Sequence, residues 1–215
     1  RPKNAADRYP IKIGQLRTPY RSFNLGKIST EKPFTKYFDV FNDGNTPLKF
    51  VDKAAHATYI SIRYEPLELK PGESGHIVVT YDASQRNDLG FVTDNITLYT
   101  NEETQFEKHY RLVATIEDYF PPMTPEELSR APKLRIAKKE HDFGSMKEGQ
   151  KAEIQVMLIN DGKSELELRK IASNCNCVIA DVQKQTLKAG ESVPMVLTFD
   201  TSGRKGPQTK SVTLF

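Results

Sequence analysis

The sequence predicts an all-β protein made of two tandem β-sandwich domains joined by a short helical linker. Short runs rich in Val, Ile, Thr, Tyr and Phe alternate apolar and polar residues, with Asn-Asp-Gly, Pro-Gly and Ser-Gly between them, as is typical of short strands and tight turns. The pattern occurs twice, and a helix-start signal lies between the two copies. Repeated short strands with regular turn signals are typical of sandwiches.

The repeat is seen most clearly at two tripeptides. Asn-Asp-Gly at 42–44 recurs at 160–162, and Gly-Glu-Ser at 72–74 recurs at 190–192, an offset of 118 each time. The offset then falls to 116, since Gly90 aligns with Gly206. A two-residue deletion therefore lies in the second copy, where a loop tolerates it.

The repeat sets the predicted domain boundaries. Residues 1–13 are expected to be a linker from a preceding domain, and residues 14–118 to form the first sandwich. Residues 119–133 are expected to form a linker with a short helix. Residues 134–215 are expected to form a second sandwich whose last strand is missing.

Alternation predicts which side chains are buried, because successive side chains of a strand point to opposite faces. The expected core residues are Phe38, Val40, Leu48, Phe50, Ile77, Val79 and Tyr81, with their counterparts Val156, Leu158, Leu166, Leu168, Met195, Leu197 and Phe199. The intervening Asp39, Lys49, Glu165 and Glu167 are expected to face water. Each Asn-Asp-Gly is predicted to form a tight hairpin turn in which Asn and Gly adopt positive φ.

The linker helix is predicted from its ends. Thr-Pro-Glu-Glu at 124–127 reads as a capping box with proline in the first turn, and Ala-Pro at 131–132 ends the helix. Pro121 and Pro122 restrict the chain before it. The sequence therefore predicts a semi-rigid connection.

The first copy has a final strand that the second lacks. Residues 106–116 supply it, with alternating Tyr110, Leu112, Ala114 and Ile116, whereas Phe215 aligns with Tyr99. Either the chain is a fragment, or a partner strand completes the second sandwich by strand addition. We favour the fragment.

Composition excludes several functional classes. The chain has 215 residues, 37% of them hydrophobic, so it can bury a core. Its 31 Lys and Arg against 28 Asp and Glu give a net charge of +3, too small and too dispersed for a nucleic-acid or anionic-lipid surface. No apolar run approaches the roughly 18 residues of a membrane span. We expect neither a nucleic-acid partner nor a membrane span.

Several motifs together carry a family resemblance. In chain order they are His-Asp-Phe-Gly at 141–144, Lys-Glu-Gly at 147–149, Asn-Asp-Gly at 160–162, Cys-Asn-Cys at 175–177, Gly-Glu-Ser at 190–192 and Gly-Arg-Lys-Gly at 203–206. The chain resembles a family of secreted or surface domains of unknown function common in Bacteroidetes, whose domains are similar to the ASH, major sperm protein and PapD groups. The resemblance is best over residues 134–215. It implies immunoglobulin-like β-sandwiches that act as binding and scaffolding modules.

The same resemblance extends beyond the second copy and also has one departure. The first copy resembles the cysteine-less repeat of multi-repeat members, and Arg1, Pro2 and Lys3 resemble the linker that follows an earlier repeat. The family usually carries Cys-Gly-Cys followed by Thr, whereas this chain has Cys-Asn-Cys followed by Val178. Asn adopts the left-handed conformation less easily than Gly, which weakens any metal or redox role inferred from the pair.

Cys175 and Cys177 are the candidate reactive residues. On an extended strand they project to the same face and offer two thiolates to a soft ion such as Cu(I) or Zn. Two ligands do not make a closed site, and no second cysteine pair exists. We favour buried thiols or an i, i+2 disulfide over a metal site, and we predict no cofactor. Ala57 and Tyr59 stand at the corresponding places of the first copy.

Nothing in the sequence indicates an enzyme. His56, His76, His109 and His141 share no spacing, and no Ser or Cys has a nucleophile motif. Solvation or helix capping accounts for the Glu pairs at 102–103 and 126–127.

The sequence predicts a non-enzymatic scaffold or accessory subunit of the periplasm, outer membrane or cell surface. It would bind another protein through strand edges and loops. The alternative is a periplasmic metal- or thiol-handling module centred on Cys175 and Cys177. A carbohydrate-binding sandwich would need an exposed aromatic platform, for which the loop candidates are Tyr9, Tyr20, Tyr64, Tyr119 and Phe120.

Overall fold

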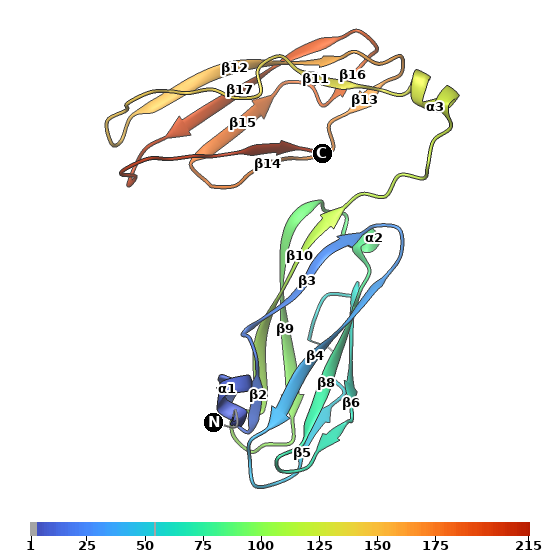
Figure 1. Ribbon diagram of the computed structural model, residues 1–215, viewed down its shortest axis with the longest axis vertical. Helices are drawn as coiled ribbons and strands as arrows, with labels where there is room; N and C mark the ends of the chain where they lie inside the picture. The colour runs from blue at the N-terminus through green and yellow to red at the C-terminus, as the bar shows by residue number, and fades with distance from the viewer. Residues whose placement is uncertain (1–3, 54) are drawn as a thin grey trace. The chain divides into compact units, whose positions relative to one another are not determined.

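The computed structural model describes residues 4–53 and 55–215, and the chain divides into two compact units, Arg1–Phe120 and Pro121–Phe215 (Figure 1). Both consist mainly of β-strands, so the all-β prediction is confirmed. The three helices among the described residues are short: α1 (Ala5–Arg8), α2 (Ala83–Arg86) and α3 (Pro125–Arg130). Arg1, Pro2 and Lys3, expected to belong to a linker, lie outside the described residues.

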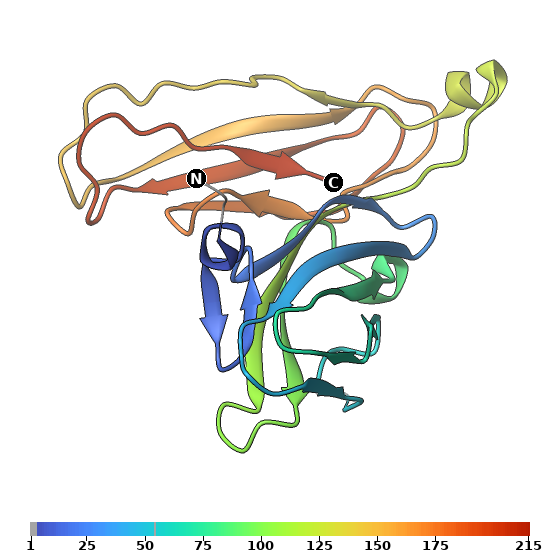
Figure 2. The same cartoon turned by 60° about the horizontal axis from the view of Figure 1, so that its bottom comes forward.

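The first unit contains two five-stranded sheets. One has the order β1 (Ile11–Ile13), β2 (Leu16–Thr18), β4 (Phe34–Asn42), β8 (Ser74–Tyr81) and β6 (Ile60–Glu65). The other has the order β3 (Ser22–Ser29), β10 (Glu107–Glu117), β9 (Gly90–Thr100), β5 (Leu48–Val51) and β7 (Glu68–Leu69). Strand β10 pairs antiparallel with β9 and parallel with β3, and Figures 1 and 2 show these strands side by side.

The sheets of the first unit pack face to face through aromatic stacks. The Phe23 ring of β3 lies 4.6 Å from the Phe38 ring of β4, and the Phe50 ring of β5 lies 4.2 Å from the Tyr64 ring of β6. Most of the predicted core residues are fully buried here: Val40, Leu48, Phe50, Ile77, Val79 and Tyr81. The period-two prediction is therefore confirmed for this unit.

Val78 departs from the alternation, because it is buried although it lies on the outer face. It pairs with Tyr37 on one side and Arg63 on the other. The Arg63 guanidinium donates a hydrogen bond of 3.2 Å to the Tyr37 hydroxyl. The two long side chains thus lie across Val78 and cover it.

The Asn-Asp-Gly segments are not hairpin turns, contrary to the sequence prediction. Strand β4 pairs with β2 and β8, whereas β5 pairs with β7 and β9, so the segment at 42–44 crosses from one sheet to the other. None of its residues has positive φ, and the same holds for 160–162. The backbone takes this route because each buried Asn side chain holds the crossing together by hydrogen bonds.

Residues 4–13 differ from the expected linker as well. They form α1 and β1, and β1 pairs with β2 at the edge of the first sheet. Tyr9 is buried and stacks on Phe41 of β4 at 5.5 Å. These contacts anchor the segment on the first unit because they remove a large aromatic surface from water.

The second unit contains a four-stranded sheet and two strand pairs. The sheet has the order β11 (Leu134–Ile136), β12 (Lys151–Asn160), β17 (Ser192–Asp200) and β15 (Val178–Val182). The pairs are β13 (Leu166–Glu167) with β16 (Thr186–Leu187), and β14 (Ile171–Ser173) with β18 (Val212–Leu214). Its buried core comprises Val156, Leu158, Leu168, Leu187, Val193 and Met195.

This core is less completely covered than that of the first unit. Leu197 and Phe199 are only partly buried, whereas their counterparts Val79 and Tyr81 are fully buried. In the first unit β3 and β10 contribute buried apolar side chains to the core, among them Phe23 and Leu112. Residues 140–147, which align with β3, form no strand. One face of the second unit is therefore left partly open.

Helix α3 begins as the capping box predicts. The Glu127 backbone N–H donates to the Thr124 hydroxyl at 3.3 Å, and the Thr124 N–H donates to the Glu127 carboxylate at 2.7 Å. Pro125 occupies the first turn, where its missing N–H costs nothing. The Thr124 N–H, together with the Thr124 hydroxyl that donates to the same carboxylate at 3.0 Å, holds the pKa of Glu127 below its usual value.

Candidate functional site

The two cysteines form a disulfide in a turn of the second unit. Cys175 and Cys177 lie between β14 and β15 with their Cα atoms 5.2 Å apart. The expectation that they lie on an extended strand is therefore wrong. Two residues of a strand span about 6.6 Å, so the chain must bend to bring the two sulfur atoms together.

Local hydrogen bonds hold this turn. The Ser173 hydroxyl donates to the Cys175 carbonyl at 2.8 Å and accepts from the Cys175 N–H at 3.3 Å. The Val178 N–H donates to the same carbonyl at 3.4 Å. Asn174 exchanges hydrogen bonds with Ser211, through its backbone N–H at 3.0 Å and its side-chain oxygen at 3.1 Å. The turn is thus attached to the loop that precedes β18.

A charged side chain from that loop reaches the disulfide turn. The Arg204 guanidinium donates to the side-chain oxygen of Asn176, the residue between the cysteines, at 3.4 Å. Its Nε is buried and has no hydrogen-bond partner in the described part of the chain. No sequence motif marks Arg204 as a site residue, but the repeat contains a signal for it, because Arg86 stands 118 positions earlier.

The corresponding position of the first unit has a different polar cluster. Arg86 pairs with Asp94, whose carboxylate also accepts from the hydroxyls of Tyr59 at 2.7 Å and Tyr81 at 2.9 Å. Burial and the adjacent Asp94 raise the pKa of Tyr59. Tyr59 aligns with Cys177, so the same place in the fold carries a phenol in one unit and a disulfide in the other.

The two sulfur-bearing residues differ in accessibility. Cys177 is 5% exposed, whereas Cys175 is only partly buried. The Cys177 carbonyl accepts from the Asp200 N–H at 2.9 Å, which fixes it against the end of β17. A hydrogen bond from Ser202 holds the pKa of Asp200 below its usual value, and the resulting carboxylate pairs with Lys151 at 3.4 Å.

This disulfide contributes little to the fold. A cross-link between residues two apart closes a very short loop, for which the chain-entropy relation gives about 1.5 kcal/mol, against about 4.7 kcal/mol for a loop of about 100 residues. The hydrogen bonds of Ser173 and Val178 already close the same turn. The first unit builds its counterpart without sulfur. Stability therefore does not explain the pair.

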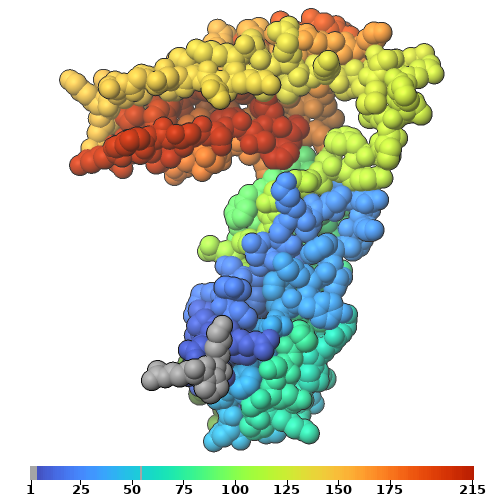
Figure 3. Space-filling model, in the orientation of Figure 1, coloured from blue at the N-terminus to red at the C-terminus, as the bar shows by residue number. Residues whose placement is uncertain are grey.

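The second feature of interest in this unit is the edge of β18. In the described part of the chain, β18 pairs only with β14. The Asn174 N–H donates to the Ser211 carbonyl at 3.0 Å, and the Phe215 N–H donates to the Lys170 carbonyl at 2.8 Å. Because backbone groups alternate sides along a strand, the N–H groups of Val212 and Leu214 point away from β14. Figure 3 shows this last segment, in red, at the surface of the second unit.

The aligned edge in the first unit is occupied. Val212 and Leu214 align with Ile96 and Leu98 of β9, which pair with Tyr110 and Lys108 of β10. In the first unit this position of the sheet is thus taken by an antiparallel strand with alternating apolar side chains.

The histidines lie apart, and no group of three His, Cys, Asp or Glu suited to a metal occurs within residues 4–53 and 55–215. His109 hydrogen-bonds Thr97 at 3.0 Å, and His141 lies 2.9 Å from the Lys138 amine. Glu102, which was expected to be solvated, instead forms a buried ion pair with Lys108. Its side chain is only 7% exposed, and its carboxylate also accepts hydrogen bonds from the Gln15 N–H and the Thr100 hydroxyl.

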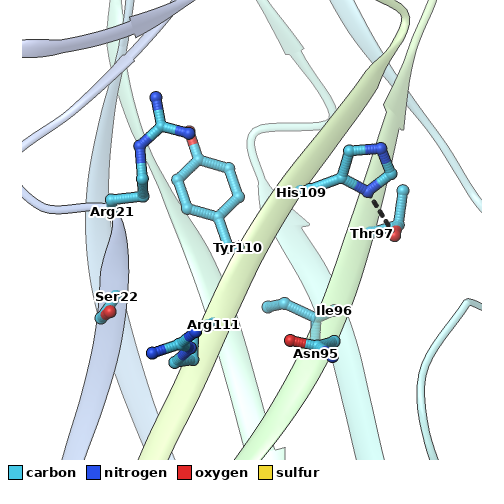
Figure 4. Close-up of a pocket in the computed structure, with 8 residues that line it drawn as sticks. All are labelled: Arg21, Ser22, Asn95, Ile96, Thr97, His109, Tyr110 and Arg111. Atoms are coloured by element: carbon cyan, nitrogen blue, oxygen red, sulfur yellow. Dashed lines mark hydrogen bonds between the residues drawn. The ribbon is translucent and has the colours of Figure 1, made fainter.

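A shallow hollow of about 540 Å³ lies on the outer face of β3, β9 and β10 (Figure 4). Ser22, Arg111 and Asn95 form one cross-strand row there. All three are exposed, as is His109. The hollow therefore offers hydrogen-bonding groups on an open surface.

The aromatic candidates for a carbohydrate platform do not gather in one place. Tyr9 is buried, and Tyr64 lies within β6, stacked on Phe50. Tyr20, Tyr119 and Phe120 are exposed, at 72%, 42% and 65%. Two of the five candidates thus serve the core of the first unit.

Comparison with known proteins gives a family and a fold. The family described as "Protein of unknown function (DUF1573)" matches residues 16–115 and 134–215. No curated protein sequence matches the chain. A crystal structure of a protein of unknown function from Porphyromonas gingivalis W83 is similar, with 15% identity, a TM-score of 0.60, and coverage of 87% of this chain and 84% of that one.

More distant structural similarity extends to chaperones. The E. coli chaperone DraB has 8% identity and a TM-score of 0.34, and covers 84% of this chain and 83% of its own. The periplasmic chaperone SfaE has 7% identity and a TM-score of 0.33, and the match covers 92% of this chain and 98% of SfaE.

None of the helices within the described residues has both the length and the apolar character that a membrane span requires.

Proposed function

This chain belongs to the DUF1573 family of proteins of unknown function, and we propose that it is a non-enzymatic protein-binding module of the bacterial cell envelope. It binds other proteins through strand edges and loops, as part of a scaffold or an accessory subunit. The observation that carries the proposal is that the described residues leave the outer edges of β3, β6 and β15 without a neighbouring strand, in addition to the edge of β18. Exposed strand edges pair with extended segments of other chains.

The first unit supports the chemistry of this binding. There β10 lies on the aligned edge and buries Tyr110, Leu112, Ala114 and Ile116. A strand that binds β18 therefore carries apolar residues at alternate positions, and its backbone supplies the affinity while its side chains supply the selectivity. Burying a single large aliphatic side chain contributes about 1.5–3 kcal/mol.

The envelope location is part of the same proposal. The Cys175–Cys177 disulfide supports it, because disulfides persist in oxidising compartments and are rare in the cytosol. Fractionation of the native organism tests it: we expect the protein in the periplasmic or membrane fraction. Recovery in the cytosolic fraction alone would overturn this part of the proposal.

The test of strand binding uses a peptide that this chain itself supplies. A labelled peptide with the sequence of residues 106–117 should bind the 215-residue protein saturably and slow amide hydrogen exchange in β18. A control peptide with Leu112→Asp and Ala114→Asp should bind at least tenfold more weakly, because it cannot bury its alternate side chains.

Two variants of one residue distinguish backbone pairing from non-specific hydrophobic binding. Val212→Pro removes an N–H that points to the open side, so peptide affinity should fall at least tenfold. Val212→Thr keeps the N–H and a similar shape, so affinity should stay within about threefold. Equal binding by the proline variant, or protection elsewhere than in β18, would contradict the proposed mode.

A further inference from the structure

We propose that Cys175–Cys177 is a redox-active disulfide that exchanges with a protein dithiol, and that Cys175 is the sulfur attacked. This goes beyond strand binding and stands independently of it. Three observations carry it: the disulfide is not needed to close its turn, its two cysteines differ in burial, and the guanidinium of Arg204 reaches the residue between them.

The first step follows from burial. An incoming thiolate attacks the Sγ of Cys175, the more exposed partner, and forms a mixed disulfide there. The Sγ–Sγ bond breaks, and its electron pair leaves on Cys177 as a thiolate, which then takes up a proton. Attack at Cys177 is disfavoured because that residue is 5% exposed.

The second step completes a balanced exchange. The other thiolate of the partner dithiol attacks its own sulfur in the mixed disulfide and releases Cys175 as a thiolate. The partner is thereby oxidised to a disulfide, and Cys175 and Cys177 are reduced to two thiols. The transfer involves two electrons and two protons, and it is reversible.

Arg204 fits a positioning role in the first step. Its guanidinium is held by Asn176, and its buried Nε–H finds no acceptor among the described residues. Held on the residue between the two cysteines, this cation favours departure of the Cys177 thiolate because a nearby positive charge stabilises the negative charge. Lys205 is the next residue in the chain, but it is exposed and lies 3.8 Å from Glu148. It therefore serves as the matched control.

The first experiment measures the disulfide itself. The folded 215-residue protein is equilibrated in glutathione redox buffers, quenched with acid, alkylated and weighed by mass spectrometry. We expect full reduction in buffers that leave structural disulfides intact, with unchanged far-UV circular dichroism. A disulfide that opens only after denaturation would overturn the proposal and make the pair a structural link.

The second experiment identifies the attacked sulfur. In Cys177→Ser the remaining Cys175 should form a mixed disulfide with oxidised glutathione at least tenfold faster than Cys177 does in Cys175→Ser. Circular dichroism confirms that both variants are folded. Equal rates, or faster reaction of Cys177, would overturn the assignment of Cys175.

The third experiment tests the arginine. Arg204→Gln should slow reduction of the folded protein by dithiothreitol at least fivefold, whereas Lys205→Gln should change it less than twofold. Because both variants lose one positive charge, the comparison separates a local effect from net charge. Equal slowing by the two variants would overturn the role of Arg204.

Discussion

Two buried asparagines, Asn42 and Asn160, make equivalent hydrogen bonds in the two units. The side-chain amide of Asn42 donates to the carbonyls of Thr46 and Leu69, both at 2.9 Å. The amide of Asn160 donates to Ser164 at 2.7 Å and to Leu187 at 3.1 Å. Each side-chain oxygen accepts from the glycine two residues later at 3.0 Å. Such buried groups are costly when unpaired, so the same residue serves both crossings.

The two glycines of these crossings should respond differently to alanine. A Cβ on Gly162 would meet the backbone of residues 131–133, which cannot move independently, whereas a Cβ on Gly44 would meet the flexible side chain of Gln15. We expect Gly162→Ala to lower the free energy of unfolding by about 3 kcal/mol and Gly44→Ala by about 1 kcal/mol. Urea denaturation measures both. A larger loss of unfolding free energy in Gly44→Ala than in Gly162→Ala would contradict the close-approach explanation.

At the scale of elements, one buried ion pair joins the β9–β10 connection to the β1–β2 turn. Lys108 of β10 is fully buried and pairs with Glu102. The same carboxylate accepts from the Gln15 N–H at 2.8 Å and from the Thr100 hydroxyl at 2.8 Å. Alternation places Lys108 on the same face as Tyr110 and Leu112, so the ion pair lies at the end of the apolar row.

Removing only the lysine of this pair should lower the free energy of unfolding more than replacing both charged residues. Lys108→Met leaves the Glu102 carboxylate buried without its cation, and we expect a loss of about 3–5 kcal/mol in unfolding free energy. The double variant Lys108→Met with Glu102→Gln should recover at least half of that loss, because no uncompensated charge remains. A double-mutant cycle by urea denaturation measures both values. A single-variant loss below about 1 kcal/mol would show that the pair is solvated.

At the scale of the whole molecule, the two units differ in their tyrosine content. All nine lie between Tyr9 and Tyr119, so residues 121–215 contain none. Burial raises the pKa of Tyr64 and of Tyr110 to about 12. Both phenols must therefore stay protonated in the folded first unit at a pH where an unfolded chain already ionises.

The sign of the effect follows from linkage. Because the folded pKa exceeds the unfolded value of about 10, the stabilisation is present below about pH 10 and is lost as the pH rises toward 12. We expect the first unit to unfold at alkaline pH together with the appearance of phenolate absorbance. Tyr64→Phe should make the loss of stability with pH less steep, whereas Tyr20→Phe, at an exposed position, should not. Identical pH profiles for the two variants would contradict the assignment.

The strand faces, the capping box of α3 and the equivalence of the two copies could all be predicted from the linear pattern of residues. These depend on local periodicity and on side chains three or four residues apart, which a linear pattern records. Val40, Leu158 and Met195 are buried where alternation placed them. The repeat also aligned Arg86 with Arg204 and β9 with β18, but only the structure showed which residues and strands these segments contact.

Which strands pair is visible only in the folded chain, and that pairing sets where the cysteines and Arg204 lie. Asn-Asp-Gly is compatible with a hairpin, but the partners of β4 and β5 are distant strands, so each segment crosses between sheets instead. Likewise the Cys-Asn-Cys spacing fits either a strand or a turn. Ser173, together with a loop some thirty residues later, selects the turn and brings Arg204 to Asn176. Contacts between segments far apart in the chain have no local signature, because they depend on how the whole unit closes.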